Sequence, residues 1–197
     1  MTEIETLEHI LQVASALIAE KGFANVSMND IVKASGVSKG GIYWHFKSKD
    51  EIIIAIVSSI FEQQLQFLDM VRATEGNARD RILTLMNMVA DSLKELPDNM
   101  PSSLDIYSLA SRHPYLATHL AEFFKQYQQH FAELIEQGIA EGLFIVDDTE
   151  ATAIIFMSTV EGIILVNTMM QAQATLSDTL LSATKLFLKG IEKTEGE

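Results

Sequence analysis

The segment from Ser27 to Phe46 constrains the fold more than any other part of the chain, because two short helical stretches meet there at a glycine turn. Ser27 is an N-cap residue followed three positions later by an acidic residue, and Gly36 is placed to take the left-handed conformation that ends a helix. Ser38 is then the cap of a second helix. Two helices of about eight residues joined by residues 36–38 predict a helix-turn-helix.

The rest of the chain also follows helical spacing. Apolar residues recur every three or four positions between residues 4 and 18 and again between 116 and 134. Capping sequences at 48–51, 147–150 and 175–178 predict three further helix starts, the last at Thr175. No hairpin pattern or internal repeat interrupts this reading. We therefore predict an all-α protein with an N-terminal three-helix helix-turn-helix domain over residues 1–50 and a C-terminal helical domain over 51–197.

Cysteine usage and hydropathy exclude several classes of protein. The 197 residues include no cysteine, so disulfides, thiolate nucleophiles and cysteine-ligated metals are excluded. The sequence starts with acidic residues, unlike a signal peptide. The most apolar window, residues 151–170, still carries Ser158, Glu161 and Asn167, which a membrane span would not favour. We expect a soluble, cytoplasmic protein without a membrane partner.

Charge is distributed unevenly along the chain. The formal net charge is −13, from 14 basic and 27 acidic residues. Residues 22–49 differ, with four lysines and Asp30 as their one acid. Such a local basic stretch suits a polyanion while the acidic remainder keeps the protein soluble. A chance cluster of solvated lysines is the alternative.

The second helix of the motif carries the residue types that bind nucleic acid. Lys39 lies at its start, and the missing side chains of Gly40 and Gly41 let a duplex come close to the backbone. Ile42 and Phe46, four positions apart, should face inward. The side chains left to reach the duplex are Tyr43, Trp44 and His45, and the start of the next helix adds Lys47 and Lys49 as phosphate contacts.

These residues belong to a longer pattern. It comprises Ile10-Leu11, Ala14, Gly22-Phe23, Ser27-Met28, Asp30 to Val32, Ser35 to Phe46 and Ser48 to Asp50. The pattern resembles the N-terminal domain of TetR-family transcriptional regulators over about the first 60 residues. The resemblance implies a homodimer that binds a palindromic double-stranded DNA operator, acts most often as a repressor, and is released by a small apolar or amphipathic effector.

The resemblance also implies roles for single residues. Those at the positions where the family usually holds phosphates are Ser27, Tyr43, His45 and Lys49, and those at the positions where it usually meets bases are Lys39 and Gly40. Ser38, Gly41, Trp44 and Lys47 complete the predicted DNA-binding set. Gly41 departs from the family pattern, in which Thr or Ser is common, and this removes a polar contact. Base readout should then rest on Lys39, Trp44 and the shape of the DNA.

The C-terminal part should hold the dimer interface. Residues 153–170 are apolar on more than one face, so both sides of that helix must be covered. One side can pack on its own chain and the other on a partner subunit, giving a four-helix bundle with the last helix. The predicted interface residues are Phe156, Val160, Ile163, Ile164, Leu180 and Phe187. A fully internal hydrophobic hairpin is the alternative.

The same part should contain an effector pocket. Seven of the nine methionines lie beyond the helix-turn-helix, and thioethers adapt to varied apolar ligands, although methionine is also an ordinary core residue. Glu161 lies within an apolar helix and needs a partner, either a cationic ligand, a subunit contact or water. The predicted lining is Met86, Tyr107, Phe123, Phe124, Tyr127, Met157 and Glu161.

Catalysis and metal binding find no support in the sequence. None of the five histidines belongs to a Glu-x-x-His or His-Glu-x-x-His motif, and no phosphate-binding glycine loop occurs. We predict no enzyme activity, no cofactor and no metal site. Two alternatives to the regulator remain open at this point: an enzyme built on a helical bundle, and a protein–protein adaptor that uses the motif without DNA.

Overall fold

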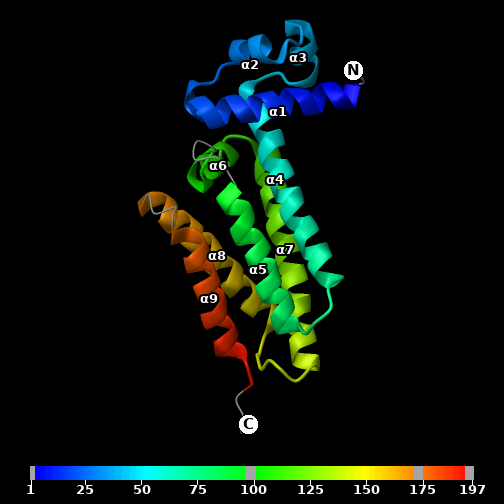
Figure 1. The fold of residues 1–197 in the computed structure, drawn as a ribbon, viewed down its shortest axis with the longest axis vertical. Coiled ribbons are helices and arrows are strands. Elements are labelled where there is room, and N and C mark those ends of the chain that lie inside the picture. Colours follow the sequence, from blue (N-terminus) through cyan, green and yellow to red (C-terminus); the bar gives the residue numbers. More distant parts are fainter. Residues whose placement is uncertain (1–2, 96–100, 171–174, 194–197) are drawn as a thin grey trace. The chain divides into compact units, whose positions relative to one another are not determined.

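The computed structural model describes residues 3–95, 101–170 and 175–193. Over these residues it is built from helices, with one isolated bridge between Phe144 and Glu192 and no strand. The predicted all-α class is confirmed. The elements are α1 (Glu3–Lys21), the short 3-10 helix η1 (Phe23–Asn25), α2 (Met28–Ser35), α3 (Lys39–His45), α4 (Lys49–Arg72), α5 (Ala78–Glu95), α6 (Ser103–Ala110), α7 (Pro114–Ala140), α8 (Thr149–Met170) and α9 (Leu176–Ile191) (Figure 1).

The chain divides into two compact units. The N-terminal unit consists of Met1–Phe61 and Leu96–Ala117, and the C-terminal unit of Glu62–Glu95 and Thr118–Glu197. The N-terminal unit thus contains more than residues 1–50, because the start of α4 and the whole of α6 pack with it. A functional boundary after residue 50 stays a prediction.

In the N-terminal unit, α2 and α3 lie along the same side of α1 (Figure 1). The apolar stripe of α1 supplies Ile10, Ala14 and Ile18, which are fully or almost fully buried. Ile31 of α2 and Ile42 of α3 are likewise buried in this unit. The side chains that hold the three helices together are those that the helical spacing predicted to be buried. Helix α3 packs against the rest of the unit through one of its sides only.

Local capping fixes where α2 and α3 begin and end. Ser27 and Asp30 form a reciprocal capping box, in which the Ser27 Oγ accepts the Asp30 N–H and the Asp30 side chain accepts the Ser27 N–H. Gly36 takes a φ of 66°, the left-handed region expected of it. The Ser38 Oγ accepts the Gly41 N–H at 3.0 Å. The predicted helix-turn-helix is confirmed in each of these details.

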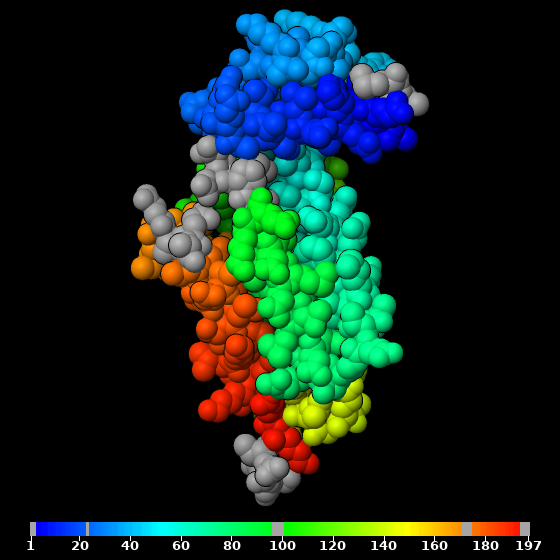
Figure 2. Space-filling view, viewed as in Figure 1, coloured from blue at the N-terminus to red at the C-terminus, as the bar shows by residue number. Residues whose placement is uncertain are grey.

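In the C-terminal unit, α9 packs against α5 and α8. The space-filling view shows α5 and α9 side by side on one face (Figure 2). Aromatic rings from three helices form the centre: Phe131 of α7 stacks on Phe156 of α8 at 4.3 Å between centroids, and Phe187 of α9 lies 4.6 Å from Phe156. This stack joins α7, α8 and α9.

The start of α9 differs from expectation. Thr175 occupies the N-cap position, but its side chain makes no capping bond; its hydroxyl donates instead to Asn167 Oδ1 at 3.4 Å. The prediction of a side-chain cap from Thr175 was wrong, because the end of α8 offers its hydroxyl another acceptor. The start of α8 agrees with expectation, since Asp148 Oδ1 accepts the Ala151 N–H at 2.9 Å.

Two helices, α4 and α8, are long and apolar enough by length and composition to cross a membrane. The same is true of many helices in the cores of proteins outside membranes. In α8, only 17% of the most apolar stretch is buried within the described chain, so this helix leaves much apolar surface uncovered. The absence of a membrane partner stays a prediction.

Candidate nucleic-acid interface

Helix α3 has one buried side and one exposed side. Ile42 is fully buried and Phe46 is 6% exposed, as their spacing predicted. On the opposite side, Trp44 is 71% exposed and Tyr43 36% exposed, and the backbone at Gly40 faces solvent. The side of α3 that carries the predicted DNA contacts is therefore accessible.

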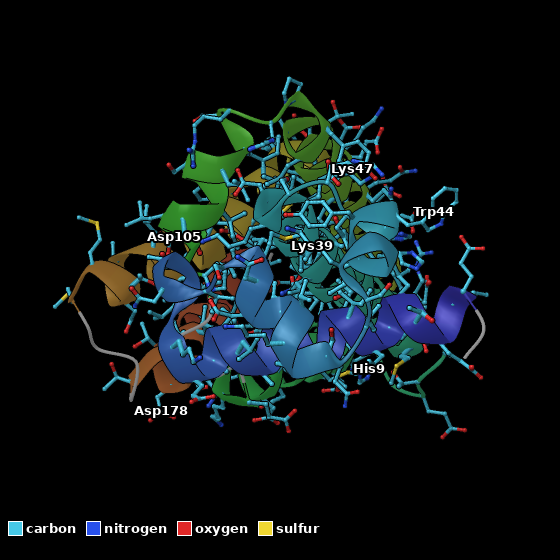
Figure 3. The ribbon with its side chains drawn as sticks, turned by 90° about the horizontal axis from the view of Figure 1, so that it is seen from above. His9, Lys39, Trp44, Lys47, Asp105 and Asp178 are labelled. Carbon is cyan, nitrogen blue, oxygen red and sulfur yellow. The ribbon has the colours of Figure 1, made fainter. Side chains whose placement is uncertain are left out.

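The exposed side chains of α3 are partly preorganised by one another. The Lys39 ammonium lies 5.8 Å from the centre of the Tyr43 ring, within the range of a cation–π interaction. Figure 3 shows Lys39 and Trp44 on the same helix, with Lys47 just beyond its end. A cation, an aromatic hydroxyl and an indole are thus presented together.

The two glycines of α3 differ in whether packing within the chain leaves space for a side chain. A Cβ at Gly40 would meet nothing within 4 Å, so no packing within the chain requires a glycine there. A Cβ at Gly41 would lie 3.0 Å from Val37 Cγ1 and 3.2 Å from Ser38 Oγ, closer than most such contacts. Gly41 thus allows the turn to pack tightly against α3. Sequence reasoning explained the residue by close approach of the duplex and by a lost polar contact, and it missed this constraint.

The Lys47 side chain forms hydrogen bonds to the backbone at the end of α3. Its ammonium donates to the carbonyl of Tyr43 at 2.7 Å and to that of Trp44 at 3.3 Å, two acceptors that the helix end leaves without an intrahelical donor. Its backbone N–H donates to Glu51 Oε2 at 2.6 Å. The side chain therefore stabilises the end of α3, and a phosphate contact by Lys47 stays a prediction.

At the start of α4, the carboxylates of Asp50 and Glu51 make contacts that were not expected. The Ser48 Oγ accepts the Glu51 N–H at 3.2 Å, while the Glu51 carboxylate bonds to Lys47 rather than back to Ser48. Asp50 Oδ2 lies 2.9 Å from His113 Nε2 in the residues before α7. Lys49 is half-buried in this first turn. One backbone N–H at this helix start is thus taken by the Glu51 carboxylate, and a phosphate contact by Lys49 stays a prediction.

Ser27 lies at the start of α2 and His45 at the end of α3, beside the exposed side of α3 and not on it. Ser27 is exposed, and its two bonds to Asp30 hold the pKa of that carboxyl below its ordinary value. His45 is half-buried, with its ring centre 6.5 Å from that of Phe46. A phosphate contact by either residue stays a prediction.

Four of the seven predicted effector residues gather in the C-terminal unit. The ring centres of Phe123 and Phe124 are 5.3 Å apart, and those of Phe123 and Tyr127 are 5.8 Å apart. Burial and then the charge of Glu161 raise the pKa of the Tyr127 phenol above its ordinary value, so the carboxylate lies near this cluster. We name Phe123, Phe124, Tyr127 and Glu161 the aromatic cluster.

For the other three predicted effector residues, a place in the effector pocket stays a prediction. Met86 is fully buried and serves as a core residue of α5. Met157 is half-buried, and Tyr107 belongs to the N-terminal unit. A groove of about 390 Å³ elsewhere in the C-terminal unit was not predicted; it is lined by Lys125, Gln128, Gln129, Ala132, Glu133, Glu136 and Glu150.

The predicted dimer residues differ in how far their own chain buries them. Phe156, Val160 and Leu180 are buried by their own chain, and the ring of Phe156 stacks on that of Phe131. Ile163, Ile164 and Phe187 are half-buried. The uncovered apolar side chains of the two helices are different ones: Ile154, Ile155, Val166, Met169 and Met170 on α8 and Leu186 on α9.

Among residues 3–95, 101–170 and 175–193, no group of three or more His, Asp or Glu side chains is arranged to hold a metal ion. His113 and Asp50 form a pair at 2.9 Å, which joins two helix starts within the N-terminal unit.

Comparison with known proteins agrees with the geometry in both parts of the chain. The family described as "Bacterial regulatory proteins, tetR family" matches residues 10–56, and that described as "AefR-like transcriptional repressor, C-terminal domain" matches residues 103–188. The uncharacterized HTH-type transcriptional regulator YfiR of Bacillus subtilis is 26% identical over 184 residues, which cover 92% of this chain and 89% of that protein. The HTH-type transcriptional repressor NemR of Escherichia coli K12 is 34% identical over 83 residues, 42% of each chain.

Solved structures show the same fold. A TetR transcription regulator from Haloarcula marismortui superposes with a TM-score of 0.84 at 18% identity, over 96% of this chain and 99% of that one. A transcriptional regulator from Saccharomonospora viridis, solved in complex with choline, superposes with a TM-score of 0.82 at 21% identity, over 96% and 99% of the two chains.

Proposed function

The chain belongs to the TetR family of bacterial transcriptional regulators, and on that premise we propose that it is a repressor that binds a palindromic operator as a homodimer and is released by a small effector. The family consists of ligand-responsive DNA-binding regulators rather than enzymes. We expect the protein in the cytoplasm, where it meets DNA.

The exposed side of α3 is the observation that carries this proposal. Lys39, Tyr43 and Trp44 project from a short helix whose other side is anchored by Ile42. To enter a major groove, a helix must pack on its own domain through one side and expose the opposite side to the DNA. Gly40 adds an open backbone that a duplex can approach without displacing any side chain.

The uncovered apolar side of α8 and α9 supports a homodimer. Ile155 is 61% exposed, Met169 68% and Leu186 72%, and such a concentration is unusual on a surface left in water. A second copy of the same surface would cover these side chains across a twofold axis. We therefore propose the exposed residues of α8 and α9 as the interface, in place of Phe156 and Leu180.

The aromatic cluster supports an effector with an apolar body. A carboxylate next to aromatic rings also suits a positive charge, since both attract cations. Glu161 and Tyr127 therefore favour an amphipathic cation over a neutral compound. The Saccharomonospora viridis neighbour was solved with choline, which is such a cation.

Selection from random DNA tests the proposed function. The full-length protein is incubated with a pool of randomised duplexes at low salt, and the bound duplexes are amplified and sequenced. We expect an inverted repeat whose half-sites lie about one helical turn, or roughly 34 Å, apart. A pool that shows no enrichment would overturn the proposal and favour a protein–protein adaptor. The enriched sequence is called the selected duplex below.

A further inference from the structure

The first residue of α1 reaches the exposed side of α3. Trp44 Nε1 donates a hydrogen bond to Glu3 Oε1 at 3.4 Å, joining residues 41 positions apart. Both side chains are exposed, and both lie within the N-terminal unit. Figure 3 shows Trp44 projecting outward from α3 on the side where α1 begins.

A carboxylate at this place works against general DNA binding. The exposed side of α3 otherwise presents Lys39 and, at its end, Lys47. Phosphates are attracted by such cations and repelled by an acid placed among them. Glu3 should therefore weaken binding to every duplex by a similar factor, whatever its sequence.

The same carboxylate restricts the indole. Trp44 is 71% exposed, so little packing within the chain selects its orientation. Its N–H is the one polar group of the ring, and an acceptor that holds this N–H favours one orientation over the others. An apolar ring held in a fixed place can distinguish bases, for example by contact with the methyl group of thymine.

We propose that Glu3 is a positioning residue for Trp44, which holds the indole by its N–H so that α3 discriminates between DNA sequences. This inference rests on the proposed function of α3 in DNA binding. It separates two effects of one carboxylate: the negative charge lowers affinity for all DNA, and the acceptor oxygen raises the preference for the selected duplex.

Two substitutions of Glu3 separate these effects. Glu3→Gln removes the charge but keeps an acceptor oxygen, whereas Glu3→Ala removes both. Glu8→Gln is the matched control, because Glu8 is exposed on the same helix and the substitution changes the charge equally. Affinities are measured for the selected duplex and for a scrambled duplex of the same length and composition, at one salt concentration.

We expect Glu3→Gln and Glu8→Gln to leave the ratio of the two affinities unchanged. Glu3→Ala should lower that ratio by about threefold to tenfold, the range that corresponds to one lost hydrogen bond. Equal ratios for Glu3→Ala and Glu3→Gln would overturn the inference. A wild-type protein that selects no duplex would overturn the proposed function instead.

A second readout needs no DNA. Trp44 is the one tryptophan of the chain, so intrinsic fluorescence reports on this side chain alone. We expect Glu3→Ala to lower the steady-state anisotropy of the indole and change its emission maximum, with Glu3→Gln and Glu8→Gln close to wild type. Emission that is identical in all four proteins would overturn the inference, even if DNA binding were intact.

Discussion

Helices α3 and α8 both place large apolar side chains in water, but their surroundings differ. Trp44 on α3 is 71% exposed, and Met170 on α8 is 70% exposed. On α3 the groups that share the exposed side are Lys39, which lies over the Tyr43 ring, and the open backbone of Gly40, with the Glu3 carboxylate bonded to the indole N–H. On α8 they are further apolar residues such as Ile155. Exposure alone therefore says little; the neighbouring groups indicate a polyanion for α3 and a second apolar surface for α8.

The largest effect is expected from a substitution on the inner side of α8, which should lower the free energy of unfolding. Phe156 is almost fully buried between the rings of Phe131 and Phe187. Phe156→Ala should lower the free energy of unfolding by about 3–5 kcal/mol, measured by chemical denaturation at one protein concentration. Ser158→Ala, at an exposed position of the same helix, is the control. A loss near that of the control would mean that Phe156 faces a partner rather than its own core.

The outer side of α8 should control assembly instead of folding. Ile155→Asp places a charge on the uncovered surface, so it should weaken the dimer on the order of 100-fold and leave the helical circular dichroism of the monomer intact. Ile139→Asp on α7, where the side chain is 39% exposed, is the control. Sedimentation velocity distinguishes the species. A dimer that survives Ile155→Asp would contradict the proposed interface.

Removal of a cation from α3 should affect DNA binding and not assembly. Lys39→Ala should weaken binding to the selected duplex about tenfold, the lower part of the range for a base contact. Lys185→Ala, an exposed lysine of α9, makes the same change in net charge. Fluorescence titration of the two variants gives the comparison. Similar losses in both would mean that net charge, rather than the α3 surface, governs binding.

The smallest expected effect concerns the cap of α2. Ser27→Ala should cost about 1 kcal/mol of stability at neutral pH, because α2 loses its N-cap. The bonds from Ser27 lower the pKa of Asp30 in the folded state, so their contribution is present above the ordinary carboxyl pKa and lost as the pH falls through the lowered value. Denaturation of both proteins between pH 7 and pH 2 measures the difference. A difference that grows on acidification would contradict the contact.

The helix-turn-helix could be predicted in detail because its determinants are local. The capping box at Ser27, the left-handed turn at Gly36 and the buried pair of Ile42 and Phe46 each depend on residues within four positions of one another. Local sequence is sufficient for such features. The packing constraint on Gly41 was missed although Val37 and Ser38 are equally local, because it depends on distances of a few tenths of an ångström within the turn that no residue pattern specifies.

The packing of α8 could not be predicted in the same way. Ile155 and Phe156 are adjacent and both apolar, yet one is 61% exposed and the other 1% exposed. A helix that is apolar nearly all round has no periodicity to indicate its buried side. Only the rings of α7 and α9 decide which side is covered. Two of the predicted dimer residues on α8, Phe156 and Val160, consequently lie on its buried side.

DNA should contact α2 and α3 and not α9. Because the chain contains no cysteine, a single introduced cysteine can carry a DNA-cleaving iron chelate at a chosen position. We expect the chelate on Ala34→Cys, an exposed position of α2, to cut both half-sites of the selected duplex, and the chelate on Lys185→Cys, an exposed position of α9 outside the proposed interface, to leave the duplex intact. Cleavage from position 185, with none from position 34, would contradict the account.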